Sequence, residues 1–349
     1  KADALTVEKL AMLYLAHIED PDSENSRGRP YSPQTVRGYK NHLLNHIIPE
    51  YRLEGGGSTL IEEVKRKDVK VWLKKKASGK NKAPSQANHL LTTFNAMLSW
   101  AVEEEMIEAN QLAGIKKKPG GTYKPKTRAL DYSPQLEKVI YKGEIATFWA
   151  GLEDVNPLHW EALRLVLMTG LRPGEVLGAE WWHIDDDEWD IPVENTKSKK
   201  SAHKIPMTAD IKRMLKALRK MTGETGYLFP QSRYEEDRLL KDGKKLKWTK
   251  GKDGNYKPVE TSTVSKVLKG LELEPFSPHD LRRTVATHLK SLGFMQAEIG
   301  LLLHHSTADV TLIYAQGDDM KRKLKMLNAW QRKLKQILSG QVASNVVSM

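Results

Sequence analysis

Tyr314, near the carboxyl end, has the most distinctive potential for chemistry in this chain. Three clusters of arginine and histidine precede it, at Arg172, at His279–Arg283 and at a histidine pair ending with His305, which is nine residues before Tyr314. A phenol can attack phosphorus as a nucleophile, and fixed cations can stabilise the transition state without a metal ion. The residue types and their order therefore predict a site that cleaves a phosphodiester.

The first cluster places Arg172 directly before Pro173, with Glu175 two residues further on. Proline is favoured at the first position of a helix, and an acidic residue is favoured in its first turn. Arg172 is therefore expected at the amino end of a helix, where backbone amides and the helix dipole favour an anion such as phosphate. Taken alone, an arginine at this position is more often an ordinary surface residue.

The second cluster, Ser277-Pro-His-Asp280, matches a capping box in which Ser277 and Asp280 close the amino end of a helix. His279 and Arg282 are three residues apart, so they share one helix face and can reach the same ligand. A purely structural histidine is the alternative. The residues expected to face the core are Leu281, Val285 and Leu289.

The third cluster, His304-His305, makes a poor zinc site because no third histidine follows at helical spacing. The chain has no cysteine, which excludes disulfides and thiolate zinc sites. We therefore expect no metal and no cofactor. Taken alone, Tyr314 on an amphipathic helix is more often a core residue with a solvated hydroxyl.

The composition favours a polyanionic partner, since 56 Lys and Arg against 44 Asp and Glu give the 349-residue chain a net charge of +12. No stretch approaches the roughly 18 apolar residues that a membrane span needs. We therefore expect no contact with a membrane and a cytoplasmic location, which the family resemblance described below would place in bacteria, in association with the nucleoid.

Three regions follow from the distribution of apolar and charged residues. Helical periodicity predicts a DNA-binding domain over residues 1–115, a basic linker over 116–133 and a catalytic domain over 134–349. An ordinary solvated helix face is the alternative for the basic runs. The residues expected to contact DNA are Lys65, Arg66, Lys67, Lys74, Lys75 and Lys76.

Within the second half, residues 190–207 are predicted to form a hairpin with Lys197 near its tip. Residues 226–229 are expected to be extended, and residues 233–257 to form a charged surface insertion with a tight turn at 252–255. Helices are predicted over residues 144–152, 160–168 and 173–179.

Together the motifs resemble the tyrosine recombinase, or phage integrase, family over Ala129–Gln316, and the domain plan is similar to that of genomic-island and satellite-phage integrases. The resemblance implies a mainly α fold with a small antiparallel β-sheet, in which a helical core-binding domain precedes a mixed α+β catalytic domain. The catalytic set implied by the resemblance is Arg172, Lys197, His279, Arg282, His305 and Tyr314.

In the roles implied by this resemblance, Arg172 and Arg282 clamp the nonbridging oxygens of the scissile phosphate. Tyr314 attacks the phosphorus to give a 3′-phosphotyrosyl link. Guanidinium groups suit the first role, because they are planar, permanently charged and matched to phosphate oxygens.

The resemblance also implies that Lys197 protonates the departing 5′ oxygen, while Lys199 and Lys200 are alternatives on the same hairpin. His279 and His305 would move protons or bond the phosphate. Glu175 would hold the catalytic residues in position without touching the substrate, and Arg283 would contact DNA. The family usually has glycine before its third-motif histidine, whereas this chain has His304 there.

The implied function is integration or excision of a mobile element by a homotetramer on two sites in double-stranded DNA, with accessory DNA-bending or directionality proteins. A resolvase of chromosome or plasmid dimers and a type IB topoisomerase-like enzyme are alternatives, and a non-catalytic DNA-binding regulator is a third. The regulator would have no use for Tyr314 together with both arginines.

Apolar residues at three- and four-residue steps predict one further helix, over residues 320–338. This helix can pack on its own domain or dock on a neighbouring protomer, and the pattern favours neither. The family resemblance supports docking on a neighbour, which predicts that a chain deleted from Asn328 onward still folds and binds a single site but assembles and recombines poorly.

Overall fold

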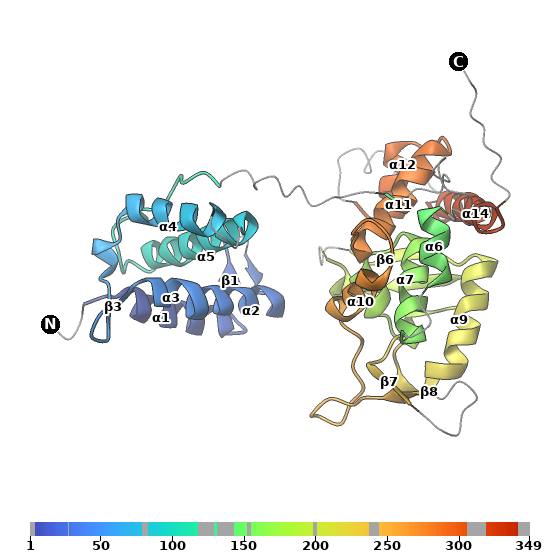
Figure 1. Cartoon of the computed structure of the whole chain (residues 1–349), viewed down its shortest axis with the longest axis horizontal. Helices are drawn as coiled ribbons and strands as arrows, with labels where there is room; N and C mark the ends of the chain where they lie inside the picture. The colour runs from blue at the N-terminus through green and yellow to red at the C-terminus, as the bar shows by residue number, and fades with distance from the viewer. Residues whose placement is uncertain are drawn as a thin grey trace, which may run out of the picture. The chain divides into compact units, whose positions relative to one another are not determined.

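The computed structural model divides the chain into two compact units, Lys1–Pro125 and Lys126–Met349 (Figure 1). Each unit has a hydrophobic core of its own. The structure describes residues 4–26, 28–78, 83–117, 129–130, 143–151, 155–197, 201–236, 244–305 and 319–340. Most of the expected linker and the expected nucleophile, Tyr314, lie outside these residues.

The amino-terminal unit is a set of helices with two very short hairpins (Figure 1). Its helices are α1 (Val7–Glu19), α2 (Pro33–His42), α3 (Ile48–Glu50), α4 (Arg66–Ser78) and α5 (Pro84–Glu103), with a π turn at Leu43–Ile47 and a 3-10 turn at Ile61–Glu63. Its strands are β1 (Glu24–Asn25) with β2 (Arg29–Pro30), and β3 (Arg52–Leu53) with β4 (Gly57–Ser58).

These helices begin where their sequences provide a cap, and they meet along apolar faces. The Thr6 side chain accepts a hydrogen bond from the Lys9 N–H at the start of α1, and Pro84 opens α5. Tyr14 and Phe94 are fully enclosed in the core between them. The helical character predicted for this half is confirmed.

The carboxy-terminal unit surrounds the long helix α7 with other helices and two antiparallel hairpins (Figure 1). Its helices are α6 (Glu144–Ala150), α7 (Pro157–Thr169), α8 (Pro173–Leu177), α9 (Ala209–Thr222), α10 (Thr261–Val267), α11 (Pro278–Ser291), α12 (Gln296–Leu302) and α14 (Asp319–Leu338), with 3-10 turns at Trp181–His183, Val193–Asn195, Gly223–Thr225 and Leu268–Gly270. Its strands are β5 (Glu188–Ile191) with β6 (His203–Pro206), and β7 (Ser232–Glu236) with β8 (Lys244–Trp248). The predicted fold class, mainly α with small antiparallel sheets, is confirmed.

The hairpin predicted over residues 190–207 is β5–β6, in which Ile191 pairs with His203 and Lys197 lies in the connection. The segment predicted to be extended at residues 226–229 is not a regular strand, but Tyr227 makes a β-bridge to Glu180 and the Phe229 carbonyl accepts from the Val259 N–H at 2.9 Å. The charged insertion contains the hairpin β7–β8, which its composition did not predict.

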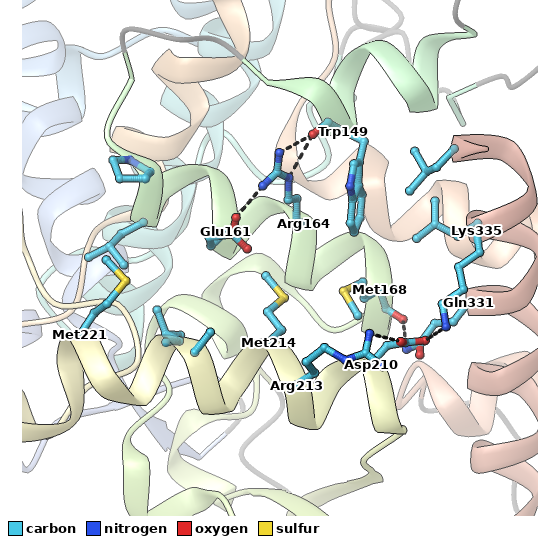
Figure 2. Close-up of a pocket in the computed structure, with 16 residues that line it drawn as sticks. Trp149, Glu161, Arg164, Met168, Asp210, Arg213, Met214, Met221, Gln331 and Lys335 are labelled. Carbon is cyan, nitrogen blue, oxygen red and sulfur yellow. Dashed lines mark hydrogen bonds and ion pairs between the residues drawn. The ribbon is translucent and has the colours of Figure 1, made fainter. Parts of the chain in front are cut away.

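Helix α14 packs on its own unit. The Trp330 indole N–H donates to the Leu167 carbonyl at 2.6 Å. Figure 2 shows Gln331 and Lys335 reaching α7 and α9 beside a groove of about 580 Å³, where Gln331 donates to the Met168 carbonyl and Lys335 pairs with Asp210 at 2.6 Å. These contacts bury one face of α14 against its own unit, whereas docking of this segment on a neighbouring protomer stays a prediction.

Among the described residues, none of the helices combines the length and apolar character needed to cross a bilayer.

Candidate active site

Arg172 lies at the amino end of α8, as predicted, and its guanidinium is fixed on two sides. Nη1 donates to Glu175 Oε1 at 2.6 Å, and Nη2 donates to the His304 carbonyl at 2.9 Å. Glu175 also accepts the Arg172 backbone N–H through its other oxygen at 2.9 Å. Because Glu175 is buried, it holds both the helix end and the arginine head in one orientation.

Arg282 approaches the same place from α11 and is only 2% exposed. Its Nη1 donates to the Gly170 carbonyl at 2.9 Å, and its Nη2 donates to the Leu303 carbonyl. Burial, followed by the charge of Arg172, lowers the pKa of Arg282 to about 10, so the group stays cationic at neutral pH. Two cations are therefore held close together by backbone carbonyls of one turn, Leu303-His304.

The start of α11 has the predicted cap, since the Ser277 N–H donates to Asp280 Oδ2 at 2.8 Å and Pro278 is the first helical residue. Leu281, Val285 and Leu289 are fully buried, as predicted. His279 is exposed in the first turn, whereas Arg283 is half-buried and donates to Asp280 at 2.7 Å.

The turn after α12 presents His304 and exposed His305 beside the two arginines. The His305 N–H donates to the Gly300 carbonyl at 2.9 Å, and the His304 N–H donates to the Leu301 carbonyl at 3.3 Å. This is the Schellman arrangement that ends many helices, and it places His304 at a left-handed position with φ 51°.

Both predicted site histidines are neutral at pH 7. The side chains of both residues are exposed to solvent on one side only, and protein atoms desolvate the rest of each ring. This partial desolvation, then the charges of Arg282 and Arg172, lowers the pKa of His305 to about 4. Partial desolvation, then the charges of Arg283 and Arg282, lowers the pKa of His279. Neutral imidazoles next to two cations can accept or donate hydrogen bonds at a phosphate without adding charge.

Lys197 is exposed, and its charge contributes to the lowered pKa of His279, so its ammonium group lies within electrostatic range of the same site. The structure thus brings together four of the six predicted catalytic residues, Arg172, His279, Arg282 and His305, and places Lys197 within electrostatic range of His279. The sixth, Tyr314, lies outside the described residues, as do Lys199 and Lys200.

Comparison with known proteins matches residues 141–321 to the phage integrase family. The chain belongs to this family. The tyrosine recombinase XerC of Corynebacterium glutamicum is 24% identical over 304 residues, which cover 85% of each chain. The resemblance seen in the sequence is confirmed, and with it the enzyme class, a site-specific DNA recombinase.

Solved integrases have the same fold. A lambda integrase dimer bound to a COC′ core site aligns with a TM-score of 0.58 and 16% identity over 91% of this chain and 78% of that one. The Tn1549 transposon integrase in complex with circular intermediate DNA aligns with a TM-score of 0.54 and 18% identity, over 91% of this chain and 98% of that one. These likenesses establish the architecture of the family for this chain.

The basic residues singled out in the amino-terminal unit lie on α4 or directly before it. All are exposed except Lys76, which is half-buried. Arg66, Lys67 and Lys74 border a groove of about 580 Å³ between α4 and α5, and Arg66 donates to the Ala113 carbonyl at 2.6 Å. Val71 is 59% exposed beside them.

Sequence reasoning missed the residues that support the site from other elements. The His203 ring stacks on the His304 ring, and the Ser201 hydroxyl shares a hydrogen bond with the His304 ring. Lys323 of α14 donates a hydrogen bond to the Lys204 carbonyl at 2.7 Å. Their neighbours are more than 100 residues away in sequence, so no local pattern predicts these contacts.

Gly170 is another missed residue, and its replacement by alanine should destabilise the site. Its φ is +70°, and a Cβ atom would lie 2.9 Å from Leu303 Cδ2. We expect about 1 kcal/mol of backbone strain, and roughly 1–3 kcal/mol more from overpacking. Thermal unfolding measures the loss. Gly226→Ala is the matched control, because Gly226 has φ +81° with open space around it; an equal loss in both variants would contradict the clash.

His305 should make folding sensitive to acid. Its folded pKa is about 4, below the unfolded value, so the unfolded state binds more protons between these values. The folded state therefore has its full stability above about pH 6.5, and it loses the contribution of neutral His305 as the pH falls from there through 4. NMR titration of the ring and acid unfolding of His305→Gln measure this effect. A ring that titrates near its ordinary value in the free protein would show that the site is more open to water.

Proposed function

We propose that this chain is an integrase that cuts and rejoins DNA through a 3′-phosphotyrosyl intermediate in order to integrate or excise a mobile element. The observation that carries the proposal is the pair of guanidiniums, Arg172 and Arg282, anchored to successive carbonyls of one turn. Each guanidinium has five N–H donors and uses only some of them in hydrogen bonds within the protein. The remaining N–H groups can donate to the nonbridging oxygens of one phosphate.

Tyr314 is the proposed nucleophile. Its phenolic oxygen forms a bond to phosphorus as the bond to the 5′ oxygen breaks, and the two arginines stabilise the negative charge of the pentacoordinate state. Lys197 gives its proton to the departing 5′ oxygen. A 5′-hydroxyl of another strand then attacks the phosphotyrosyl link, which restores the phosphodiester and releases Tyr314 without ATP.

The neutral state of His279 and His305 supports a hydrogen-bonding role for both. A neutral ring can donate one N–H to a phosphate oxygen and take up a proton elsewhere. Glu175 does not reach the substrate in this scheme. Its carboxylate keeps the Arg172 head aimed at the site, as its two bonds to that residue indicate.

The amino-terminal unit is the proposed DNA-binding domain, because exposed Arg66, Lys67 and Lys74 border one groove on α4 and α5. We propose that Lys65, Arg66, Lys67, Lys74, Lys75 and Lys76 contact DNA phosphates, together with Arg283 of the catalytic unit.

Assembly as a homotetramer on two double-stranded sites is part of the proposal. A lambda integrase tetramer bound to a Holliday junction has the same fold, with a TM-score of 0.57 over 87% of this chain. Accessory DNA-bending or directionality proteins and a location in the bacterial cytoplasm, at the nucleoid, follow from this function.

Trapping of covalent complexes tests the proposal. The full chain is incubated with fragmented DNA of its source element, denatured, and the attached DNA is sequenced while the modified peptide is identified by mass spectrometry. The expected result is one recurrent sequence joined through its 3′ phosphate to Tyr314. Attachment through another residue would refute the assignment, and relaxation of plasmids without any recurrent sequence would favour a topoisomerase. Loss of complexes in EDTA, reversed by Mg²⁺, would contradict the metal-independent mechanism.

A further inference from the structure

His304 occupies a backbone conformation that suits glycine. In the part of the chain that the structure describes, only Glu105 and His304 are non-glycine residues with positive φ, at 56° and 51°. A side chain in this left-handed region costs about 1 kcal/mol, and glycine is the usual residue at this position of a Schellman turn. An interaction of the His304 imidazole must therefore offset this cost.

The ring of His304 is held by two residues of the β5–β6 hairpin. It stacks on His203, with ring centroids 4.7 Å apart and planes 23° from parallel. Its Nε2 lies 3.0 Å from Ser201 Oγ, and the two atoms share a hydrogen bond. The imidazole therefore links the turn of the arginine site to the hairpin.

His203 is suited to this contact and to little else. It is 1% exposed, and neither ring nitrogen has a hydrogen-bond partner among the described residues. A buried polar atom without a partner costs about 1–3 kcal/mol, so the ring contributes here through its stack on His304 and not through hydrogen bonds. Burial, then the charges of Lys323, His304 and the two arginines, lowers the pKa of His203 and keeps the stacked ring neutral.

We propose that His304, His203 and Ser201 form a latch that holds the start of β6 against the turn that anchors both arginines and thereby restrains Lys197. This inference rests on the proposed function, and it makes His304 a positioning residue for the general acid. Ser201 is four residues after Lys197, so a bond to Ser201 restricts the position of the ammonium group.

The two parts of His304 have separate tasks. Its carbonyl accepts from Arg172, and its imidazole holds the hairpin. Replacement by glycine keeps the carbonyl and relieves the backbone strain, but it removes the latch. His304→Gly should therefore leave the phosphate clamp intact and affect the delivery of the proton.

The test compares two leaving groups in the full chain, on a duplex that carries the recovered cleavage site. One substrate has the natural 5′ oxygen, and the other has a 5′-bridging phosphorothiolate, whose sulfur leaves without protonation. Misplacement of a catalytic group by 1 Å can cost on the order of 10²-fold, so we expect His304→Gly to slow oxygen cleavage about tenfold or more. Sulfur cleavage should stay within about threefold of wild type. Lys197→Ala is the reference for this pattern.

Glu105→Gly is the matched control, because Glu105 ends α5 in the same Schellman turn, with the Met106 N–H on the Ala101 carbonyl at 2.8 Å, away from the latch. It should leave the ratio of oxygen to sulfur cleavage unchanged. Ser201→Ala and His203→Ala should shift the ratio as His304→Gly does, whereas His203→Phe, which keeps an aromatic ring for the stack, should largely restore it. Thermal unfolding should find His304→Gly at least as stable as wild type.

The outcomes separate the two claims. No covalent complex from the wild type would overturn the proposed function and the latch with it. Wild-type cleavage matched by His304→Gly on both substrates would overturn the latch alone. Equal impairment on both substrates would do the same, because it would assign His304 to the phosphate clamp.

Discussion

Arg282→Ala should lower the rate of DNA cleavage by about 10²–10³-fold, which is typical for loss of one preorganised charge stabiliser. The physical reason is the position of the guanidinium, which is fixed by the carbonyls of Gly170 and Leu303 before any substrate binds. Its orientation is therefore set during folding and costs nothing when charge develops on the phosphate. Single-turnover cleavage of a trapped substrate measures the effect.

The same substitution should also reduce stability. It leaves two buried carbonyls without their donor, at about 1–3 kcal/mol for each unsatisfied group. Arg282→Lys should recover little activity, because an ammonium group cannot reach two divergent carbonyls and a phosphate at once.

Arg164→Ala is the matched control for Arg282→Ala. Arg164 also donates to a backbone carbonyl in this unit, that of Trp149 at 3.0 Å, but it lies beside the groove next to α14 (Figure 2). The Arg164→Ala variant should be less stable than the wild type, but it should cleave DNA at the wild-type rate at a temperature where it remains folded. Wild-type rates in Arg282→Ala under the same conditions would remove Arg282 from the clamp.

The sequence predicted the local parts of this site well, because helix ends follow short-range rules. Pro173 and the Ser277–Asp280 cap are read from four adjacent residues, and the structure has both. The apolar spacing of α11 similarly predicted Leu281, Val285 and Leu289 as core residues. Local spacing thus defined the elements that carry Arg172, His279 and Arg282.

The contacts that join these elements could not be predicted from spacing. The bond from Arg172 to the His304 carbonyl links residues 132 positions apart. His304 was noted as a departure from the family pattern, but only its φ and its stack on His203 reveal a use for the side chain. The hairpin β7–β8 was missed for another reason, since charged residues dominate it and hide the alternation of a strand.

Truncation of the chain before Asn328 should abolish folding of the carboxy-terminal unit. The deletion removes Trp330, Leu334 and Ile337, which are buried in the main core. Removal of one buried tryptophan side chain costs about 3–5 kcal/mol, and a whole domain is stable by only about 5–15 kcal/mol. Loss of the buried side chains of Leu334 and Ile337 costs about 2–5 kcal/mol each in addition, so the combined loss is comparable to the whole stability of the unit.

Specific contacts add to the apolar loss. The Trp330 ring stacks on buried His288 at 5.3 Å, and its N–H satisfies the Leu167 carbonyl. Gln331 bonds the Met168 carbonyl and accepts from Thr208, which caps α9. Deletion leaves the Leu167 and Met168 carbonyls and the Thr208 hydroxyl without these hydrogen-bond partners.

Circular dichroism, solubility and thermal unfolding measure the result, with two comparison chains. A chain that ends at Gly340 keeps all of α14 and should fold with an unchanged melting temperature. Trp330→Ala in the full chain should fold with a stability lower by about 3–5 kcal/mol. A soluble, cooperatively folded protein that lacks residues 328–349 would contradict this account, because α14 would then contribute little to its own domain and would be free to act on another protomer.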